Sequence, residues 1–242
     1  MDKVVVITGA SRGLGLELAT KFVASGDKVF GISRTQDHWA SVKKAVPSSN
    51  LKLLQADLTK EKDVKSVFAE IKKETGSIDL LINNAGYCGP LAKVEDISLD
   101  DLEAHLKQNL ASAFLMCKYA IPVMKDRKDA LIINVSSMAG TRAVPRLFPY
   151  SAAKFGVLAL SQAIAKENDG TGLKCITVCP GGMNTQMRKD LFGAEDAAKQ
   201  QSPDFVAQII EQIIQGEIEV LSGGHIVIRH GKIAGVFPPP AA

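Results

Sequence analysis

Tyr150 and Lys154 are the residues whose types and spacing most directly suggest chemistry in this 242-residue chain. They lie four apart, in an Ala-rich segment that runs to Lys166, and on a helix their side chains would share one face. A phenol is a weak acid, with a pKa of about 10, and a nearby ammonium group favours the phenolate. The spacing therefore predicts a tyrosine that can donate and accept a proton near neutral pH.

A glycine-rich turn, Thr8-Gly-Ala-Ser-Arg-Gly-Leu-Gly15, separates the first predicted strand from the first predicted helix. Its glycines permit a tight turn, close approach of a pyrophosphate and close helix–strand packing. The N-terminus of the helix offers unpaired N–H groups to phosphates. We therefore predict a dinucleotide site and hydride chemistry. The residues of the turn assigned to the cofactor are Gly9, Ser11, Arg12, Gly13, Leu14 and Gly15.

Arg34 follows the second predicted strand, at the position where enzymes that use NAD(H) usually present a carboxylate to the ribose. This chain has Ser33-Arg34 there, and Arg12 lies in the glycine-rich turn. Arginine binds phosphate through two hydrogen bonds, so the pair favours NADP(H) over NAD(H). Taken alone, Arg34 is more typical of a solvated loop than of a phosphate site.

Two further segments end strands at the expected cofactor edge. Asp57, with Leu58 beside it, could accept a hydrogen bond from the adenine amino group, or could belong to a helix cap near Thr59. In Asn83-Asn-Ala-Gly86, small residues let the chain run close to the adenosine ribose, and we expect ligand contact through Asn84 and Ala85.

Asn109 and Ser137 are candidate active-site residues that the local sequence alone does not distinguish from structural ones. Asn109 lies in a long apolar helical pattern, where a satisfied buried amide is the simpler interpretation, although asparagine is a poor helix former. Ser136-Ser137 ends the fifth predicted strand, at the sheet edge where ligands bind in such folds. Ser136 is also ordinary turn material.

Short apolar runs alternate with helical segments along the whole chain, which predicts a single-domain, Rossmann-type, doubly wound parallel sheet of about seven strands with helices on both faces. The expected strands are Val4–Thr8, Lys28–Ser33, Leu51–Ala56, Ile78–Asn83, Ala130–Ser136, Lys174–Cys179 and Ile226–Arg229. The expected helices are Leu14–Ser25, Lys60–Glu74, Leu99–Met124, Tyr150–Glu167 and Pro203–Gln215. We expect Thr59 to cap the second of these helices and Ser202 the last.

The expected domain spans residues 1–236 and is followed by a Pro-rich tail, 237–242. Residues 181–202 have no strong pattern, and we interpret them as a mobile substrate flap. The composition is 46% hydrophobic with a net charge of +3, too balanced to indicate nucleic acid or an anionic membrane. With neither a secretion signal nor a membrane span, we expect a cytoplasmic protein with four free cysteines and no metal site.

These motifs together resemble the classical short-chain dehydrogenase/reductase family. Five markers stand in order: the Thr8–Gly15 turn, Asn83–Gly86, Asn109, Ser137 with Tyr150-x3-Lys154, and Pro180-Gly-x3-Thr185. They extend from Thr8 to Thr185. The stretch from Gly216 to His230 departs from the family pattern because it is more polar and richer in glycine.

The resemblance implies a catalytic tetrad and further cofactor contacts. Tyr150 would be the general acid, or the base in oxidation, and Ser137, 13 residues before it, would bind the substrate oxygen. Lys154 would lower the Tyr150 pKa and, like Tyr150, bind the cofactor. Asn109 would hold a water. Around the nicotinamide, the implied contacts are Pro180, Gly181, Met183 and Thr185.

The function expected from the residues and the resemblance together is NADPH-dependent reduction of a ketone, aldehyde or 3-oxoacyl group. The resemblance also implies a homodimer or homotetramer built on the helices that hold Asn109 and Tyr150. Two alternatives stay open: a cofactor-binding sensor without turnover, and an alcohol dehydrogenase. A sensor would not need the Tyr–Lys pair, which this chain retains. The expected pocket wall is Cys88, Met138, Arg142, Phe148, Met187, Leu191 and Phe192, with Arg188 nearby.

Overall fold

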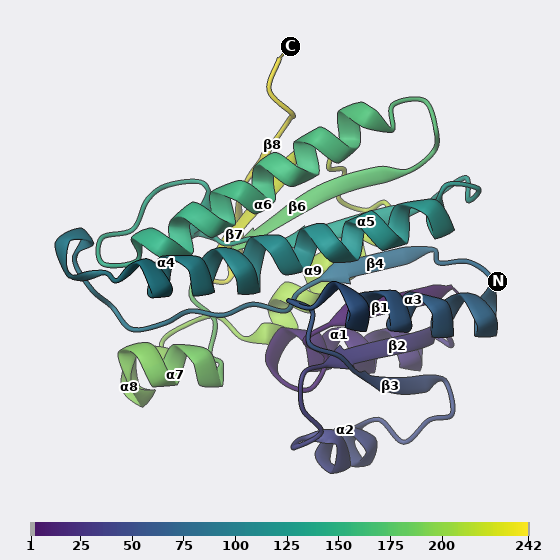
Figure 1. Cartoon of the computed structure of the whole chain (residues 1–242), viewed down its shortest axis with the longest axis horizontal. Helices are drawn as coiled ribbons and strands as arrows, with labels where there is room; N and C mark the ends of the chain where they lie inside the picture. Colours follow the sequence, from purple (N-terminus) through teal and green to yellow (C-terminus); the bar gives the residue numbers. More distant parts are fainter. Residues whose placement is uncertain (1–2, 242) are drawn as a thin grey trace.

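Eight strands form one sheet in the computed structural model, which describes residues 3–241. The spatial order is β3-β2-β1-β4-β5-β6-β7-β8, and every neighbouring pair is parallel except β7 with β8. The strands are Val4–Thr8 (β1), Lys28–Ser33 (β2), Leu51–Gln55 (β3), Leu80–Asn83 (β4), Leu131–Val135 (β5), Lys174–Pro180 (β6), His225–Arg229 (β7) and Lys232–Phe237 (β8). The doubly wound fold is thereby confirmed (Figure 1).

The strand count differs from the expected seven because of β8, which folds back antiparallel on β7. The connection is the two-residue turn His230-Gly231, and both residues have positive φ, 53° and 66°. Positive φ at both central residues is the geometry of the turns that suit β-hairpins. Phe237, which the sequence assigned to the tail, is the last residue of this strand.

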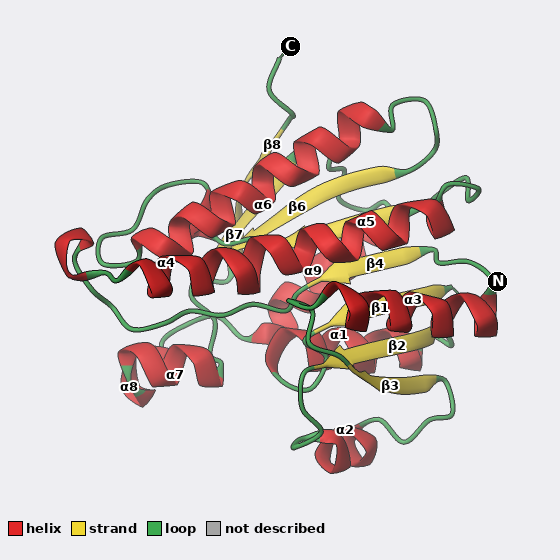
Figure 2. Cartoon of the chain, viewed as in Figure 1, coloured by secondary structure: helices red, strands yellow, loops and turns green. Residues whose placement is uncertain are grey.

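Helices cover both faces of the sheet (Figure 2). Helices α1 and α9 pack on one face, and α3, α5 and α6 pack on the other. The α-helices are Gly13–Ala24 (α1), Trp39–Ala45 (α2), Glu61–Thr75 (α3), Leu99–His105 (α4), Ser112–Met124 (α5), Phe148–Glu167 (α6), Gln186–Phe192 (α7), Ala194–Ala198 (α8) and Pro203–Gln215 (α9).

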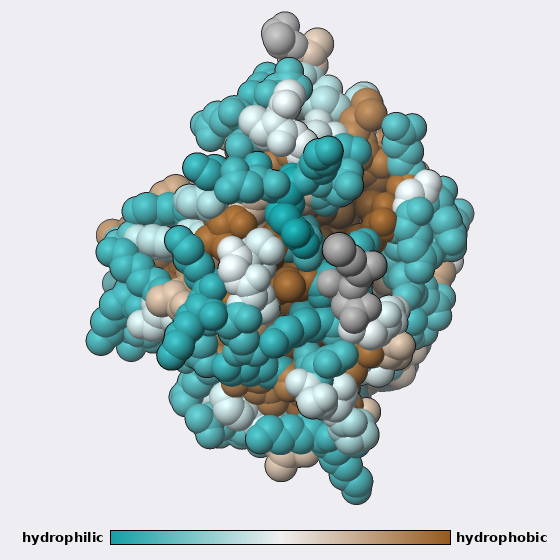
Figure 3. Space-filling model, turned by 90° about the vertical axis from the view of Figure 1, so that its right-hand side faces the viewer, coloured by the Kyte–Doolittle hydropathy of each residue, from teal (hydrophilic) through white to brown (hydrophobic). Residues whose placement is uncertain are grey.

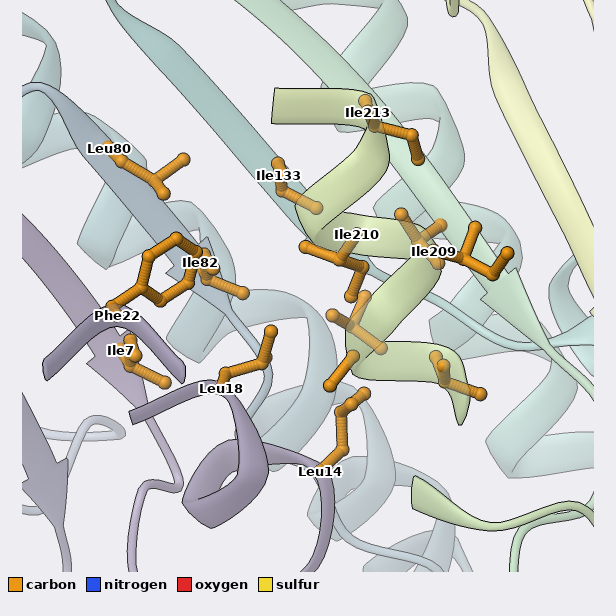
Figure 4. Packing of buried hydrophobic residues seen from close by; sticks show 14 of the residues in the cluster. Ile7, Leu14, Leu18, Phe22, Leu80, Ile82, Ile133, Ile209, Ile210 and Ile213 are labelled. Carbon is orange, nitrogen blue, oxygen red and sulfur yellow. The ribbon is translucent and has the colours of Figure 1, made fainter. Parts of the chain in front are cut away.

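The packing of α1 fixes the glycine-rich turn in place. Leu14, Leu18 and Phe22 recur at intervals of four, so they share one face of the helix. Figure 4 shows this face against Ile210 of α9 and the apolar side chains of the sheet. Burying such side chains contributes roughly 1.5–3 kcal/mol each, and this layer holds the N-terminus of α1 at the carboxyl end of β1.

The expected helix Leu99–Met124 is not one continuous α-helix. Between α4 and α5 the segment Leu106–Ala111 winds as a π-helix, and Asn109 lies inside it. Short π-helical segments within α-helices occur frequently at functional sites. The Asn109 amide bonds backbone groups outside its own turn, which accounts for an asparagine in the middle of an apolar pattern.

Other local expectations had mixed outcomes. Ser202 does cap α9, because its hydroxyl accepts a hydrogen bond from the Phe205 N–H at 3.1 Å. Thr59 does not cap α3; its hydroxyl instead donates to Asp57 at 2.7 Å. Helix α2 was not expected, and residues 181–202 are not structureless, since α7 and α8 lie within them.

The surface is mainly hydrophilic on the face near the N-terminus, where hydrophobic residues show through only in recesses between polar side chains (Figure 3). Across residues 3–241, no helix is both long and apolar enough to cross a membrane.

A row of polar side chains crosses the buried sheet. The pairing places Asn83 beside Asn134, Asn134 beside Thr177, and Thr177 beside His225. Asn134 is satisfied, since it accepts from Asn83 and donates to the Ser161 hydroxyl. Three buried side-chain atoms of the described chain lack a hydrogen-bond partner, and all belong to this row: Asn83 Oδ1, Thr177 Oγ1 and His225 Nδ1.

Thr177→Val tests the cost of an unpartnered hydroxyl in this row. A buried polar group without a partner costs about 1–3 kcal/mol, and valine has nearly the shape of threonine. We expect the variant to unfold at higher denaturant concentration, with a free energy of unfolding about 1 kcal/mol above wild type. The matched control is Ser161→Ala, which removes the hydroxyl that accepts from the Asn134 amide at 2.9 Å and should lower that free energy. Equal destabilisation by both changes would contradict this interpretation.

Candidate active site

An open cleft of about 870 Å³ lies at the carboxyl ends of the strands. Most of the residues assigned from the sequence line it, including the glycine-rich turn, Arg34, Tyr150 and Lys154. Among the cofactor residues assigned from sequence, Gly15, Pro180 and Gly181 do not line it, and neither do Asn109 and Ser137. The lining residues that sequence reasoning missed include Glu17, Thr35, Asp37, His38 and Gln108.

The glycine-rich turn has the shape that a dinucleotide requires. Gly9 and Gly13 have positive φ, 68° and 54°, a conformation that side chains with a Cβ rarely adopt. A Cβ on Gly15 would lie 2.2 Å from the Gly9 carbonyl oxygen, so only glycine lets α1 approach the turn this closely. The residues present therefore fit the cofactor that the turn implies.

The neighbouring strand end is tied to this turn by Thr8 and Asn84. The Thr8 hydroxyl accepts hydrogen bonds from the Asn84 and Ala85 N–H groups, both at 2.9 Å. The Asn84 amide donates back to the Thr8 carbonyl at 3.0 Å. These bonds hold the ends of β1 and β4 together, and Asn84 and Ala85 line the cleft as expected.

Arg12 and Arg34 stand at the end of the cleft formed by β1 and β2. Both are exposed, and neither forms an ion pair within residues 3–241. The Arg34 guanidinium donates to the Gln108 side chain at 3.1 Å. The Ser33 hydroxyl is already occupied, because it donates to the Thr35 carbonyl and accepts from the Trp39 indole. Two cations therefore remain available to an anionic group.

Asp57 binds the residues just before α3 and also borders the cleft. Its carboxylate accepts from both the N–H and the hydroxyl of Thr59, at 3.1 and 2.7 Å, and lies 3.4 Å from the Lys60 ammonium. Burial favours a higher pKa for Asp57, but these hydrogen bonds and the Lys60 charge outweigh it and lower the pKa. The structural interpretation is therefore observed, and the position also permits ligand contact.

Lys154 is almost fully buried behind Tyr150, with 4% of its surface exposed. Its Nζ lies 5.8 Å from the centroid of the Tyr150 ring and donates to the Val135 carbonyl at 2.9 Å. Ser137 begins the turn that follows β5, and its hydroxyl accepts from the Ala139 N–H at 3.1 Å. The structure thus brings Ser137, Tyr150 and Lys154 together at one edge of the sheet.

Burial dominates the ionisation of this pair. It lowers the pKa of Lys154 from 10.5 to about 8 and raises the pKa of Tyr150 above its ordinary value, while a hydrogen bond with Ser137 acts in the opposite direction. The pKa of Tyr150 in the protein without cofactor is therefore raised rather than lowered, because desolvation disfavours the phenolate.

Asn109 holds the loop after β4 rather than lining the cleft. Its amide donates to the Tyr87 and His105 carbonyls, both at 2.9 Å, and its oxygen accepts from the Tyr87 N–H at 3.0 Å. His105, one turn earlier, accepts from the Gly89 N–H at 2.9 Å. The two side chains hold the segment that carries Cys88 in place. Sequence reasoning missed His105, although its spacing of four residues from Asn109 places both on one helical face.

Gly86 separates Asn109 from Lys154. A Cβ at this position would lie 3.1 Å from Asn109 Oδ1 and 3.5 Å from Lys154 Nζ. Both polar groups therefore lie close to the Gly86 backbone, and only a residue without a side chain fits there without strain.

The segment after β6 completes the cleft. Met183 and Thr185 line it, and the Thr185 hydroxyl accepts from the Arg188 N–H at 3.3 Å, which caps α7. The Gly181 N–H is used by the Ile228 carbonyl at 2.7 Å, beside β7. These contacts place the start of the expected flap in the wall of the cleft.

The expected pocket wall is only partly observed. Of its members, those that line the cleft are Cys88, Met187 and Leu191. Arg188 is not free, since it pairs with Asp196 and stacks over the Phe192 ring at 3.7 Å. Met138 contacts Arg142, whose guanidinium lies 3.7 Å from the Met138 sulfur.

Comparison with known proteins gives the family. The model of the family described as short chain dehydrogenase matches residues 3–196. The chain belongs to this family. Its members are oxidoreductases that act on carbonyl and alcohol groups with a nicotinamide cofactor, and this short-chain dehydrogenase has the matching Rossmann-type fold.

Its relatives act on varied molecules. The chain is 32% identical over 188 residues to a 3beta-hydroxysteroid dehydrogenase of Mediterraneibacter gnavus, covering 77% of this chain and 68% of the relative. It is 32% identical over 203 residues to an NADPH-dependent pterin aldehyde reductase of Arabidopsis thaliana, covering 84% and 83%. A solved 3-ketoacyl-(acyl-carrier-protein) reductase of Brucella melitensis, complexed with NADH, has a TM-score of 0.85 at 24% identity, covering 93% and 96%.

Lys154→Met tests the burial of the amine. Below pH 8 the lysine is charged in both the folded and unfolded chain, and its burial lowers stability. As pH rises from about 8 to 10.5, the folded protein loses the proton first and this penalty disappears. We expect the free energy of unfolding of wild type to rise by about 3 kcal/mol relative to Lys154→Met across this window. Parallel curves, measured by urea unfolding without cofactor, would contradict the shift.

Proposed function

We propose that this short-chain dehydrogenase reduces a carbonyl group to an alcohol with NADPH, and that Tyr150 is the general acid. The observation that carries the proposal is the arrangement of one cleft, with Tyr150 and Lys154 bordering it near Ser137, and Arg12 and Arg34 at its other end. A ketone, an aldehyde or a 3-oxoacyl group is the substrate class that this arrangement supports.

Arg12 and Arg34, which form no ion pair within residues 3–241, support NADP(H). At the end of β2, where a carboxylate would bind the ribose diol of NAD(H), the chain has Ser33 and Arg34. A relative that is 32% identical is an NADPH-dependent reductase. Asp37 also borders this part of the cleft, and its charge weakens the preference without removing the two cations.

Proton transfer is assigned to the residues at the end of β5 and the start of α6. The cofactor, when bound in the cleft, would supply the hydride that the carbonyl carbon accepts. The Ser137 hydroxyl donates a hydrogen bond to the substrate oxygen and stabilises the negative charge that develops there. Tyr150, whose raised pKa keeps it protonated, donates its proton to that oxygen. Lys154 stabilises the phenolate that remains and returns a proton to it. Lys154 then regains a proton from solvent through a water that Asn109 would hold.

Residues 181–202 act as the substrate flap in this proposal. Helices α7 and α8 form a unit held by the Arg188–Asp196 ion pair, and Gly193 lies between them with a φ of 87°. Met187 and Leu191 of α7 face the cleft. They would supply apolar contacts to the part of the substrate beyond the carbonyl group.

We also infer a homodimer or homotetramer that uses α5 and α6. Phe114 of α5 and Phe155 of α6 are 47% and 41% exposed. Large exposed apolar side chains on neighbouring helices support a protein–protein interface. The active-site residues Tyr150 and Lys154 lie on the same helix as Phe155, so this interface would stabilise the site.

Tyr150→Phe separates catalysis from binding. Phenylalanine keeps the ring and removes the proton, so we expect NADPH affinity within a factor of about three and turnover reduced by about 100-fold or more. The control is Tyr119→Phe, because the Tyr119 hydroxyl bonds the exposed Glu61 carboxylate away from the cleft. Normal turnover in Tyr150→Phe, measured as NADPH oxidation with a panel of ketones and aldehydes, would overturn the assignment.

Arg34→Asp tests the choice of cofactor. A carboxylate repels the 2′-phosphate and can accept from a ribose diol, so the ratio of the Kd values for NADH and NADPH should fall by about tenfold or more. Arg142→Asp serves as the control, since Arg142 is exposed but does not line the cleft. An unchanged ratio in Arg34→Asp would show that Arg34 does not bind the phosphate.

A further inference from the structure

The Gln108 side chain is hydrogen-bonded to Arg34, although the two residues belong to separate elements of the cleft wall. Arg34 follows β2, whereas Gln108 lies in the π-helical segment Leu106–Ala111 after β4, and both residues line the cleft. The Arg34 Nη1 donates to the Gln108 Oε1 at 3.1 Å. Because β1 lies between β2 and β4 in the sheet, this hydrogen bond joins two parts of the wall that the sheet keeps apart.

The chemistry of the two groups fixes the orientation of the Gln108 amide. A guanidinium has hydrogen-bond donors only, so the amide oxygen must face Arg34. The amide nitrogen then lies next to the guanidinium, and no hydrogen bond within residues 3–241 uses it. Its two N–H groups therefore add to the donors of Arg34 at one point of the cleft wall.

The loop that carries Arg34 is held in place in the protein without cofactor. The Ser33 hydroxyl accepts from the Trp39 indole at 2.7 Å, and the Gln55 amide donates to the Arg34 carbonyl at 3.2 Å. The backbone of Arg34 is thus held by its own loop and by β3, and its guanidinium is held by Gln108. A side chain fixed in this way has less conformational freedom to lose when it binds an anion.

Gln108 holds the guanidinium without cancelling its charge. Arg34 forms no ion pair within residues 3–241, although Glu17 and Asp37 also border the cleft. A carboxylate in the place of the amide would bind Arg34 more strongly, but it would neutralise the charge that attracts a phosphate. A neutral amide orients the cation and leaves its charge available.

We propose that Gln108 is a specificity-determining residue for the cofactor, because it positions Arg34 for the 2′-phosphate of NADP(H) and donates its own amide N–H to the same group. This inference rests on the proposed use of NADP(H). NAD(H) has a hydroxyl in place of this phosphate and gains no charge-assisted hydrogen bond from the paired donors. A change at Gln108 should therefore affect NADPH much more than NADH.

Gln108→Met and Gln108→Glu test this role through cofactor affinity alone. Trp39 is the one tryptophan of the chain and contacts the loop of Arg34, so quenching of its fluorescence gives the Kd of each cofactor without turnover. Methionine keeps the length of the side chain and removes the amide. We expect the Kd for NADPH to rise about three- to tenfold and that for NADH to change by less than about twofold.

Gln108→Glu should have a larger effect than Gln108→Met. A glutamate pairs with Arg34 and repels the 2′-phosphate, so we expect the Kd for NADPH to rise by about tenfold or more. A residue that only filled space would give the reverse order, because glutamate matches the shape of glutamine. Equal losses for NADPH and NADH in Gln108→Met, or no loss for NADPH, would overturn the proposal.

Lys107→Met is the matched control. Lys107 is exposed, belongs to the same π-helical segment and does not line the cleft. The change removes a positive charge but not the hydrogen bond to Arg34. Because salt screens an exposed charge, both Kd values should stay within about twofold of wild type. A loss of NADPH affinity equal to that of Gln108→Met would assign the effect to the segment as a whole and contradict the proposal.

A double variant separates this inference from the proposed function. We expect Arg34→Met to weaken NADPH binding, and Gln108→Met should cost less in that background than in wild type, because no guanidinium remains to be positioned. Strictly additive losses would overturn the positioning role. An unchanged ratio of Kd values in Arg34→Met would instead overturn the proposed cofactor choice. A shifted ratio in Arg34→Met with none in Gln108→Met would overturn the role of Gln108 alone.

Discussion

The burial of the Lys154 amine beside the Tyr150 ring is the interaction on which the active site depends. Lys154 is 4% exposed, and its amine donates to the Val135 carbonyl at the end of β5. In water an amine and a phenol would titrate near 10. Here desolvation moves them apart, with the pKa of Lys154 lowered to about 8 and that of Tyr150 raised. In the protein without cofactor the Tyr150 phenol therefore stays protonated. A positive charge beside the phenol would stabilise the phenolate and so favour release of the proton.

Several parts of the fold hold this pair in place. The sheet positions the ends of β1, β4 and β5 at one edge, and the apolar layer of α1 and α9 holds the glycine-rich turn there. On the opposite face, the π-helical segment turns the Asn109 amide toward the loop after β4. The same α6 that carries the Tyr–Lys pair also packs on the polar row of the sheet through Ser161.

The sequence predicted most of this because the decisive signals are local. Apolar runs identify the parallel strands, and the spacing of the glycines identifies the turn before α1. The four-residue interval places Tyr150 and Lys154 on one helical face. The errors concern non-local effects. The pKa of Tyr150 depends on burial that no spacing reveals, the π-helical segment depends on bonds between Asn109 and Tyr87, and β8 depends on a His-Gly turn with two positive φ angles.

The most direct test of the central claim is a spectroscopic titration of the Tyr150 phenol, taken as the ultraviolet difference between wild type and Tyr150→Phe. Without cofactor we expect ionisation above pH 10, since burial raises the pKa of Tyr150. With NADP⁺ bound we expect it to fall, because the positive nicotinamide ring stabilises the phenolate. A Tyr150 that ionises at or below pH 10 without cofactor, or that does not respond to NADP⁺, would contradict the assigned role of burial.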